Sequence, residues 1–398
     1  MKKGWEYKKL GEVAFFSRGL TYSKKDEVVF SDNIVLRSNN VDLVSGQIIF
    51  DELKYLSNDF CIPNEKKVKK GSLLMCMSNG SKIHLGKVAL VKEDSGYAFG
   101  GFMSIVTPFK DIDSKFFYYT LITPTYKQYI KSLSEGANIN NLKIKDLENF
   151  VIPIPPLSEQ KEIVEYLDSS FAKIDKLKEN AAKNLEEAKA LFQSALKDAL
   201  EPKEGWEEKK LKELTNKISD GSHNPPTGLS YSEYRMLSSK NVRNDNFSFD
   251  NPRYLSEDDF QKENKRTQLE KGDVLLTIVG AGLGDCCVYD FDDVIVFQRS
   301  ISVLKPNYDK ITSRFLMYSM QFRYDDIRKK SNGAAQKGIY LKQLAAYSLK
   351  LPSIKEQQSI VSFLDSLNEK VNTLQQNYSR ICDECDALKQ AILRQVFE

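Results

Sequence analysis

Two proline-bearing stretches, about half a chain apart, decide the architecture of this 398-residue sequence: IPIPPLSEQKEIVEYLD at 152–168 and LKLPSIKEQQSIVSFLD at 349–365. Proline can neither donate to a strand ladder nor continue a helix, and in both stretches it precedes a run with apolar residues every three or four positions. Ser158 and Ser353 can cap the free amides at the start of these runs. Both stretches therefore predict a hinge that opens a long helix.

Each predicted helix carries a heptad seam, in which apolar or small residues alternate in steps of three and four. The first seam is Leu167, Phe171, Ile174, Leu177, Ala181, Leu185, Ala188, Phe192, Ala195 and Ala199. The second is Leu364, Leu367, Val371, Leu374, Tyr378, Ile381, Cys385, Leu388 and Ile392. A stripe this narrow needs a partner, so we expect the two helices to form an antiparallel coiled coil, with homodimeric coiled coils as the alternative.

The rest of the chain is a tandem duplication. GWEYKKLGEV from Gly4 returns as GWEEKKLKEL from Gly205. Three further pairs follow in the same order: YLSNDF and YLSEDDF, KKGSLL and EKGDVLL, SKFFYY and SRFLMY. Five matches with nearly constant spacing, the hinge included, exclude chance and predict two similar modules.

In each module, short β-rich runs such as VLLTIV from Val274 are separated by the turn-forming residues Gly, Asn and Asp. This mixture predicts α/β (α+β) domains with a twisted sheet. The expected organisation is a first module at 1–155, a helix at 156–203, a second module at 204–353 and a helix at 354–398. Two similar modules joined by antiparallel helices would be related by an approximate twofold axis.

Composition limits the partners without choosing among them. Lys and Arg number 58 against 55 Asp and Glu, a net charge of +3, which excludes a polycation and confines any DNA contact to local patches. No run approaches the roughly 18 apolar residues of a membrane span, so we expect no membrane partner. Six cysteines and two histidines show no metal-ligand spacing, and CxxC at Cys382 lies inside a heptad, which indicates reduced thiols, a cytoplasmic protein and no metal site.

The duplicated GWE..KL openings, the hinge pattern P.P.L.EQ..IV..LD, the heptad helices and the DGSHNPP segment from Asp220 resemble the specificity subunits of Type I restriction-modification systems, over essentially the whole chain. The resemblance implies that each module reads one half of a bipartite double-stranded DNA target. It also implies that the helices dock two methyltransferase (modification) subunits, which use S-adenosylmethionine, and that restriction subunits join this core. The chain itself is expected to bind no cofactor.

Helix length is consistent with a spacing role for the two helices. About 40 residues at ~1.5 Å each span roughly 60 Å, more than one ~34 Å turn of duplex. The helices are therefore expected to act as a ruler between the two halves of the target.

Polar side chains near predicted turns are the candidate DNA contacts, because Arg, Lys, Asn and Gln suit base edges and phosphates. In the first module they are Arg18, Tyr22, Arg37, Asn39, Asn79 and Lys82, and in the second Ser222, His223, Arg235, Lys240, Gln298, Arg299 and Lys337. Asn40 and Asn241 occupy equivalent places, which favours a shared turn-forming role over readout of two different sequences. Candidates for subunit docking are Lys173, Lys176, Lys183, Glu186 and Glu187, for which a solvated helix face is the alternative.

One glycine-rich motif points to an enzyme instead. VGAGLGD from Val279 resembles the turn by which methyltransferases bind S-adenosylmethionine, and Asn224, Pro225 and Pro226 resemble part of their adenine-handling motif. However, Thr227 stands where a stacking aromatic should follow, and the equivalent segment of the first half, SNGSKIHLG, lacks the pattern. A hairpin explains both copies.

An acidic cluster also suggests catalysis, since Asp259, Glu263 and Lys265 offer the residue types of a metal-dependent nuclease, although not on a convincing strand. The sequence shows no phosphate-binding loop and no complete nucleophile-base pair. We therefore predict a non-catalytic subunit. A stand-alone DNA methyltransferase or nuclease, and a structural coiled-coil scaffold, are the alternatives.

Overall fold

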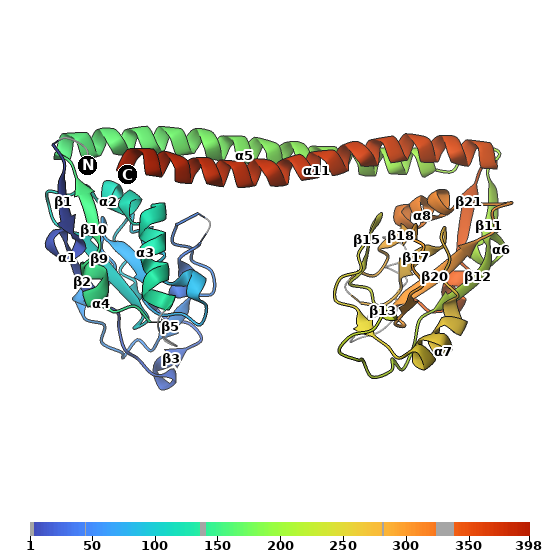
Figure 1. Cartoon of the computed structure of the whole chain (residues 1–398), viewed down its shortest axis with the longest axis horizontal. Coiled ribbons are helices and arrows are strands. Elements are labelled where there is room, and N and C mark those ends of the chain that lie inside the picture. Colours follow the sequence, from blue (N-terminus) through green and yellow to red (C-terminus); the bar gives the residue numbers. More distant parts are fainter. Residues whose placement is uncertain (1–3, 44, 136–140, 281, 324–337) are drawn as a thin grey trace. The chain divides into compact units, whose positions relative to one another are not determined.

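The computed structural model describes residues 4–43, 45–135, 141–280, 282–323 and 338–398. The chain divides into two compact units (Figure 1): unit 1 is Met1–Ala181 with Tyr378–Glu398, and unit 2 is Ala182–Asn377. Each unit contains one of the two duplicated modules and one half of each long helix.

The centre of unit 1 is a four-stranded antiparallel sheet in the order β2-β9-β6-β7. Its strands are β2 (Ala14–Arg18), β6 (Leu73–Cys76), β7 (Val88–Leu90) and β9 (Met103–Pro108). Strand β6 is buried on both faces, because Leu73 and Met75 belong to one hydrophobic cluster while Leu74 and Cys76 belong to another. A strand points successive side chains to opposite faces, which explains why this run is apolar throughout.

A smaller sheet and a two-stranded ribbon complete the strands of unit 1. The smaller sheet has the order β3-β5-β4-β8, and the ribbon pairs β1 with β10. The strands are β1 (Glu6–Lys9), β3 (Glu27–Val28), β4 (Asn33–Leu36), β5 (Lys54–Leu56), β8 (Ala98–Phe99) and β10 (Val151–Ile154). Because Glu6 lies opposite Ile154, the module begins and ends beside its hinge.

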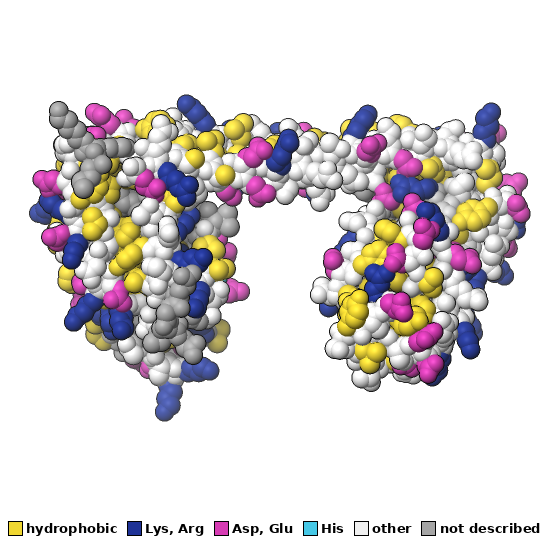
Figure 2. Space-filling view, viewed as in Figure 1, with side chains coloured by type: hydrophobic (Ala, Val, Ile, Leu, Met, Phe, Trp, Pro, Cys, Tyr) yellow, Lys and Arg dark blue, Asp and Glu magenta, His cyan; other side chains and the backbone are white. Residues whose placement is uncertain are grey.

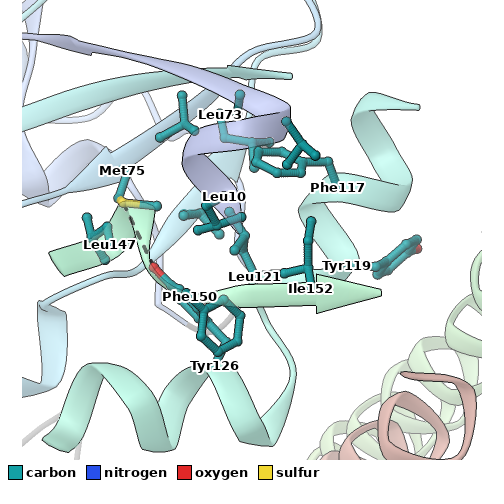
Figure 3. Packing of buried hydrophobic residues seen from close by; sticks show 14 of the residues in the cluster. Leu10, Leu73, Met75, Phe117, Tyr119, Leu121, Tyr126, Leu147, Phe150 and Ile152 are labelled. Carbon is teal, nitrogen blue, oxygen red and sulfur yellow. Dashed lines mark hydrogen bonds between the residues drawn. The ribbon is translucent and has the colours of Figure 1, made fainter. Parts of the chain in front are cut away.

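Short helices pack on one face of the four-stranded sheet. These helices are α1 (Leu10–Val13), α2 (Ser114–Thr120), α3 (Pro124–Glu135) and α4 (Ile144–Glu148). The loops of unit 1 also contain the 3₁₀ turns η1 (Lys24–Asp26), η2 (Ser38–Asn40), η3 (Asn64–Lys66) and η4 (Lys82–His84). Figure 3 shows the core between the helices and the sheet, where Leu10, Leu73 and Phe117 converge from a helix, a strand and a second helix. The hydroxyl of Tyr126 lies 3.9 Å from the sulfur of Met75 within this core.

Unit 2 repeats this arrangement. Its four-stranded sheet has the order β12-β20-β17-β18, beside a sheet β16-β13-β19 and the ribbons β11-β21 and β14-β15. The strands are β11 (Glu207–Lys210), β12 (Thr215–Asp220), β13 (Arg235–Leu237), β14 (Val242–Arg243), β15 (Asn246–Phe247), β16 (Arg253–Tyr254), β17 (Val274–Thr277), β18 (Cys286–Val288), β19 (Val296–Phe297), β20 (Ile301–Pro306) and β21 (Ser348–Leu351). The helices are α6 (Leu211–Leu214), α7 (Glu257–Thr267), α8 (Ser313–Phe322) and α10 (Leu341–Ala345).

Matching strand orders confirm the predicted duplication. The ribbon of unit 2 places Glu207 opposite Leu351, just as that of unit 1 places Glu6 opposite Ile154. The main difference is α7, an 11-residue helix at the place where unit 1 has the three-residue turn η3. A common frame therefore carries different loops in the two halves.

The long helices are α5 (Leu157–Leu200) and α11 (Ile354–Phe397), of 44 residues each. In unit 1 they run antiparallel, because Asp175 pairs with Lys389 at 2.5 Å and Lys178 with Asp386 at 2.9 Å. In unit 2, side chains of both helices, among them Phe192 of α5, join one hydrophobic cluster. Two α/β modules with a pair of long antiparallel helix segments in each unit confirm the predicted fold class.

The predicted seam is wrong at three leucines. Leu177, Leu374 and Leu388 are 57%, 39% and 47% exposed. The buried stripe passes instead through Lys178 and Lys389, whose side chains are only 23% and 21% exposed. A lysine can lay its aliphatic stem along the seam while its ammonium group reaches an aspartate on the facing helix, so the stripe need not follow the most apolar residue.

The predicted caps are correct for one helix only. Ser353 precedes α11 and its hydroxyl accepts the amide of Glu356 at 3.4 Å. In contrast, α5 begins at Leu157, so Ser158 lies inside the helix and Pro156 takes the position before it. Proline serves there because its missing amide would have no intrahelical partner.

Candidate nucleic-acid interface

The glutamines of the two hinges tie each module to its helix. The carboxamide oxygen of buried Gln160 accepts the amide of Asp113 at 2.8 Å, and its nitrogen donates to the carbonyl of Pro155 at 2.9 Å. Gln357 repeats this contact in unit 2, accepting from the amide of Thr312 at 3.1 Å and donating to Pro352 at 3.1 Å. The repeated EQ pair is thus a structural joint.

Replacing Gln357 with leucine is expected to destabilise unit 2. The substitution removes the buried side chain that pairs with the amide of Thr312 and the carbonyls of Lys310 and Pro352, at a cost of about 2 kcal/mol. The free energy of unfolding, measured by denaturant titration, checks this. The matched control is Gln358→Leu, because Gln358 is the exposed neighbour and should change stability by less than ~0.5 kcal/mol. Equal losses in the two variants would contradict the joint.

Other repeated residues also serve the hinge. Trp5 donates its indole N–H to Glu159 at 2.9 Å, and Trp206 donates to Glu356 at 3.3 Å. In these pairs the GWE opening of each module reaches the first turn of its long helix. The tryptophan and the glutamate therefore recur together in both halves because they form one hydrogen bond.

The aspartate that ends each hinge motif binds the helix that follows the large sheet. In unit 1, Asp168 accepts from Lys115 at 2.6 Å and from the hydroxyl of Tyr119 at 2.5 Å. In unit 2 the equivalents are Asp365, Arg314 and Tyr318, and Arg314 also pairs with Asp245 at 2.6 Å. Burial opposes the charge of Arg314, but the two carboxylates raise its pKa above the ordinary value.

Asn40 and Asn241 confirm the structural role predicted for them. Asn40 is fully buried, accepts the amide of Arg37 at 2.9 Å and donates to two backbone carbonyls. Asn241 accepts the amide of Ser238 at 3.0 Å and donates to the carbonyl of Asp250 at 2.8 Å. The side chains of both asparagines therefore hydrogen-bond to the backbone around the turn and stabilise it.

The DGS part of the DGSHNPP segment is also structural. A Cβ atom on Gly221 would lie 2.1 Å from the carbonyl oxygen of Phe297, and one on Gly19, its equivalent, 1.9 Å from that of Gly100. Only glycine allows these two backbone segments to approach so closely. This approach brings the end of β12 against the loop after β19.

In unit 1, two of the candidate DNA contacts lie together beside the smaller sheet. Burial raises the pKa of Tyr22, while the charges of Arg37 and Lys54 oppose the shift, so both cations lie near its hydroxyl. Arg37 also donates through Nη2 to a backbone carbonyl at 3.0 Å. Arg18 is exposed at the end of β2. Arg37 and Lys54 therefore lie near the ring of Tyr22 together with Glu27, whose carboxylate pairs with Lys54 at 2.5 Å.

The remaining candidates of unit 1 form a second group. Asn79 donates to the hydroxyl of Ser38 at 2.8 Å, which brings the loop after β6 against η2, where Asn39 is exposed. Lys82 donates to the carbonyl of Ser134 at 2.8 Å. Asn39 therefore remains the most available side chain of this group.

In unit 2, four candidates gather around the close approach at Gly221. Ser222 forms a parallel bridge with Gln298, and its carbonyl accepts the amide of Arg299 at 2.8 Å. Ser222 is only 3% exposed, whereas Arg299 is exposed. His223 lies 2.6 Å from Asp220, which also pairs with Arg266 at 2.9 Å.

The last candidates of unit 2 are more scattered. Arg235 lies over the ring of Phe249, 4.6 Å from its centroid, and pairs with Asp293. Lys240 is exposed on the turn that Asn241 holds. Lys337 lies outside the described residues.

The charged docking candidates of α5 are all exposed, and several pair along their own helix. Lys176 contacts Glu179 at 3.0 Å and Lys183 contacts Glu187 at 3.7 Å. Glu186 pairs with Lys189, and Lys173 is exposed beside the seam. Exposed pairs of this kind contribute at most about 0.5 kcal/mol each, so they leave the side chains available to a partner.

Two exposed aromatic rings lie outside the candidates predicted from the sequence. Phe30 is 76% exposed and Tyr231 75% exposed. Each stands immediately before a buried or half-buried serine, Ser31 or Ser232, that precedes β4 or β13. The shared aromatic-serine pair at the same offset in the duplication was the signal that could have identified them.

The motifs that suggested an enzyme have other structures. The glycine-rich VGAGLGD segment connects β17 to β18, which pair antiparallel as a hairpin, as do β6 and β7 in unit 1. A cofactor-binding glycine turn would instead join a strand to a helix. Asp259, Glu263 and Lys265 all lie on helix α7.

Surface charge is mixed rather than segregated. Figure 2 shows Lys and Arg side chains interspersed with Asp and Glu on the visible face of both units. Within the described ranges, no group of three or more His, Cys, Asp or Glu residues is placed to hold a metal ion. No helix in the same ranges is long and apolar enough to cross a bilayer.

Comparison with known proteins gives a family match over both halves. The family model for the Type I restriction modification DNA specificity domain matches residues 2–187 and again residues 203–381. The EcoKI specificity subunit of Escherichia coli (strain K12) is 27% identical, over 100% of this chain and 89% of that protein. The StySPI specificity subunit of Salmonella potsdam is 26% identical, with the same coverage.

Two solved structures share the fold. One comes from work on complex assembly and conformational transition of the type I R-M system, and superimposes with a TM-score of 0.77 at 20% identity, over 99% of this chain and 98% of that one. The other is the HsdS subunit from Thermoanaerobacter tengcongensis, with a TM-score of 0.56 at 19% identity, over 100% and 97%.

Proposed function

Because this chain belongs to the Type I restriction-modification DNA specificity family and is thus a DNA-recognition subunit, we propose that each of its modules reads one half of a bipartite duplex target. The family match confirms the resemblance seen in the repeated motifs. The observation that carries the proposal is the duplicated frame: two copies of one module, each matched separately by the family model.

Differences within the common frame support two distinct half-sites. Positions that the two units place equivalently carry different side chains: Asn39 against Lys240 at the turn, and Gly100 against Gln298 at the close approach. Hinge residues, in contrast, are alike in both units. Such a pattern is expected when one scaffold presents different chemistry to different base pairs.

The long helices are proposed to set the spacing and to dock two methyltransferase subunits. Their exposed leucines, Leu177, Leu374 and Leu388, and the charged residues around Lys176 and Lys183 give a helical partner both apolar and charged contacts. In this proposal the chain is non-catalytic, S-adenosylmethionine is bound by the methyltransferase, restriction subunits can be added to that core, and the complex acts in the cytoplasm.

A methylation map tests the proposed function. The chain is expressed with a methyltransferase subunit of its own system in a host without DNA methylation, and the methylated sites are compared with those from the methyltransferase alone. The expected result is a two-part motif with a fixed unspecified gap, absent from the control. Methylation that is the same with and without this chain would count against a reading role and favour the enzyme or scaffold alternatives.

A further inference from the structure

Each module presents an exposed aromatic ring at the same place in its smaller sheet. We call Val28–Ser31 of unit 1 and Leu229–Ser232 of unit 2 the tips. The backbone of Val28 pairs with Tyr55 on β5, and Leu229 forms a bridge with Tyr254 on β16. The two tips therefore lie along equivalent strands of their units. In unit 1 the exposed apolar surface extends to Val29, which is 96% exposed.

Both tip rings rest on a tyrosine of the repeated YLS motif. The ring centroids of Phe30 and Tyr55 are 5.3 Å apart, and those of Tyr231 and Tyr254 are 5.1 Å apart. The interplanar angles, 44° and 51°, are also similar. The repeated tyrosine is therefore a platform, and the residue that it supports differs between the two halves.

A serine fixes each tip to the sheet. The hydroxyl of Ser31 donates to the carbonyl of Leu56 at 2.5 Å and accepts the amide of Asn33 at 3.1 Å. Ser232 likewise donates to the carbonyl of Leu255 at 2.7 Å and accepts the amide of Tyr234 at 3.1 Å. Because the tips are held this way, the exposed rings are positioned rather than left on free loops.

The surroundings of the tips suit a nucleic acid. In unit 1, exposed Lys24 and Lys25 precede the tip, and Lys54, on the neighbouring strand β5, pairs with Glu27 at 2.5 Å. In unit 2, Arg253 adjoins the platform tyrosine in the chain and donates to the carbonyl of Pro226 at 2.6 Å, and Arg235, opposite that tyrosine in the sheet, pairs with Asp293. Cations beside an apolar centre suit a duplex, whose phosphates flank base pairs that offer thymine methyl groups in the major groove.

We propose that Phe30 and Tyr231 are base-contacting residues, each reading a base pair of its own half of the target through the apolar surface of its ring. The inference rests on the proposed function and adds the chemistry of the contact. It explains why the anchoring serine and the platform tyrosine are alike in both halves while the ring itself changes. A rigid aromatic side chain also provides contact area at little cost in conformational entropy.

The test is a methylation map of the full complex carrying Phe30→Ala or Tyr231→Ala. The expected result is that Phe30→Ala lowers discrimination roughly tenfold at one base pair of one half-site, and that Tyr231→Ala does the same only in the other. Phe30→Tyr and Tyr231→Phe keep a ring on the platform and should retain most of the discrimination. The matched control is Phe15→Ala, since Phe15 is 64% exposed in unit 1 but lies on β2 away from the tip.

The outcomes separate this inference from the proposed function. A wild-type complex with a two-part motif, together with alanine variants that keep the same motif and extent of methylation, would overturn the inference and leave the proposed function standing. Weaker complex assembly in the alanine variants, with the base preference of the remaining methylation unchanged, would also overturn it by making the tips a protein interface. A wild-type complex without any two-part motif would overturn the proposed function itself.

Discussion

Deleting the same layer from both long helices, Ile174–Asn180 from α5 and Cys385–Ala391 from α11, will shorten the gap of the two-part motif by about three base pairs. Seven helical residues rise ~10 Å, and duplex DNA rises ~3.4 Å per base pair. Both specified halves of the motif should stay unchanged. A methylation map of the double deletion measures the gap directly.

The segments are matched so that the helices can close again in register. Both polar pairs between the helices in unit 1, Asp175 with Lys389 and Lys178 with Asp386, fall inside the deleted layer together. Leu167, Leu393 and the other helix residues that pack into the core of unit 1 lie outside it. Seven residues are close to two full turns, so the remaining faces keep their directions.

Deleting Ile174–Asn180 alone is the control, because it leaves Lys389 and Asp386 without their partners and shifts one seam against the other. That variant should lose stability and activity instead of showing a clean change of gap. An unchanged gap in the double deletion, with both halves still methylated, would refute the spacing role of the helices.

Arg314→Ala is expected to destabilise unit 2 by about 3 kcal/mol, the second large effect. Arg314 joins Asp245, at 2.6 Å, to Asp365 on α11, and the side chain of Asp245 is only 16% exposed. Removing the cation leaves a mostly buried carboxylate facing a second one, and breaking such a pair typically costs 3–5 kcal/mol when burial is complete. Partial exposure of Arg314 and Asp365 lowers the expected value within that range.

The equivalent residue of unit 1 is the control for Arg314. Lys115→Ala removes one ion pair with Asp168, both side chains of which are more than a third exposed, so the loss should stay below about 1 kcal/mol. Denaturant unfolding of both variants gives the comparison. Similar losses at the two positions would show that burial of Asp245 does not decide the stability of this joint.

The repeats could be predicted from the sequence because the same contacts recur twice. The EQ pair, the GWE opening and the final aspartate of the hinge are bonded in the same way in both units, so selection for one geometry left one pattern. The course of the helix seam was harder to predict from the sequence. Lys178 fills it through a salt bridge to Asp386, a partner more than 200 positions away in the chain.

The exposure of the candidate DNA contacts could be predicted only in outline. Candidates such as Arg18, Asn39 and Arg299 are exposed, but Ser222 is nearly buried, because the exposure of a turn residue depends on which segment packs over it. The tips were missed because an isolated Phe or Tyr in a sequence usually belongs to a core. Only the sheet shows that Phe30 lies outside its platform tyrosine.

The two hinge tryptophans make the chain its own optical reporter. Trp5 and Trp206 are the two tryptophans of the sequence, and each bonds a hinge glutamate through its indole N–H. Emission excited selectively from tryptophan therefore originates at the joints alone, one source in each unit. With Trp206→Phe or Trp5→Phe the signal of a single joint remains, so strain transmitted to either joint when DNA or a partner binds can be followed without an added label.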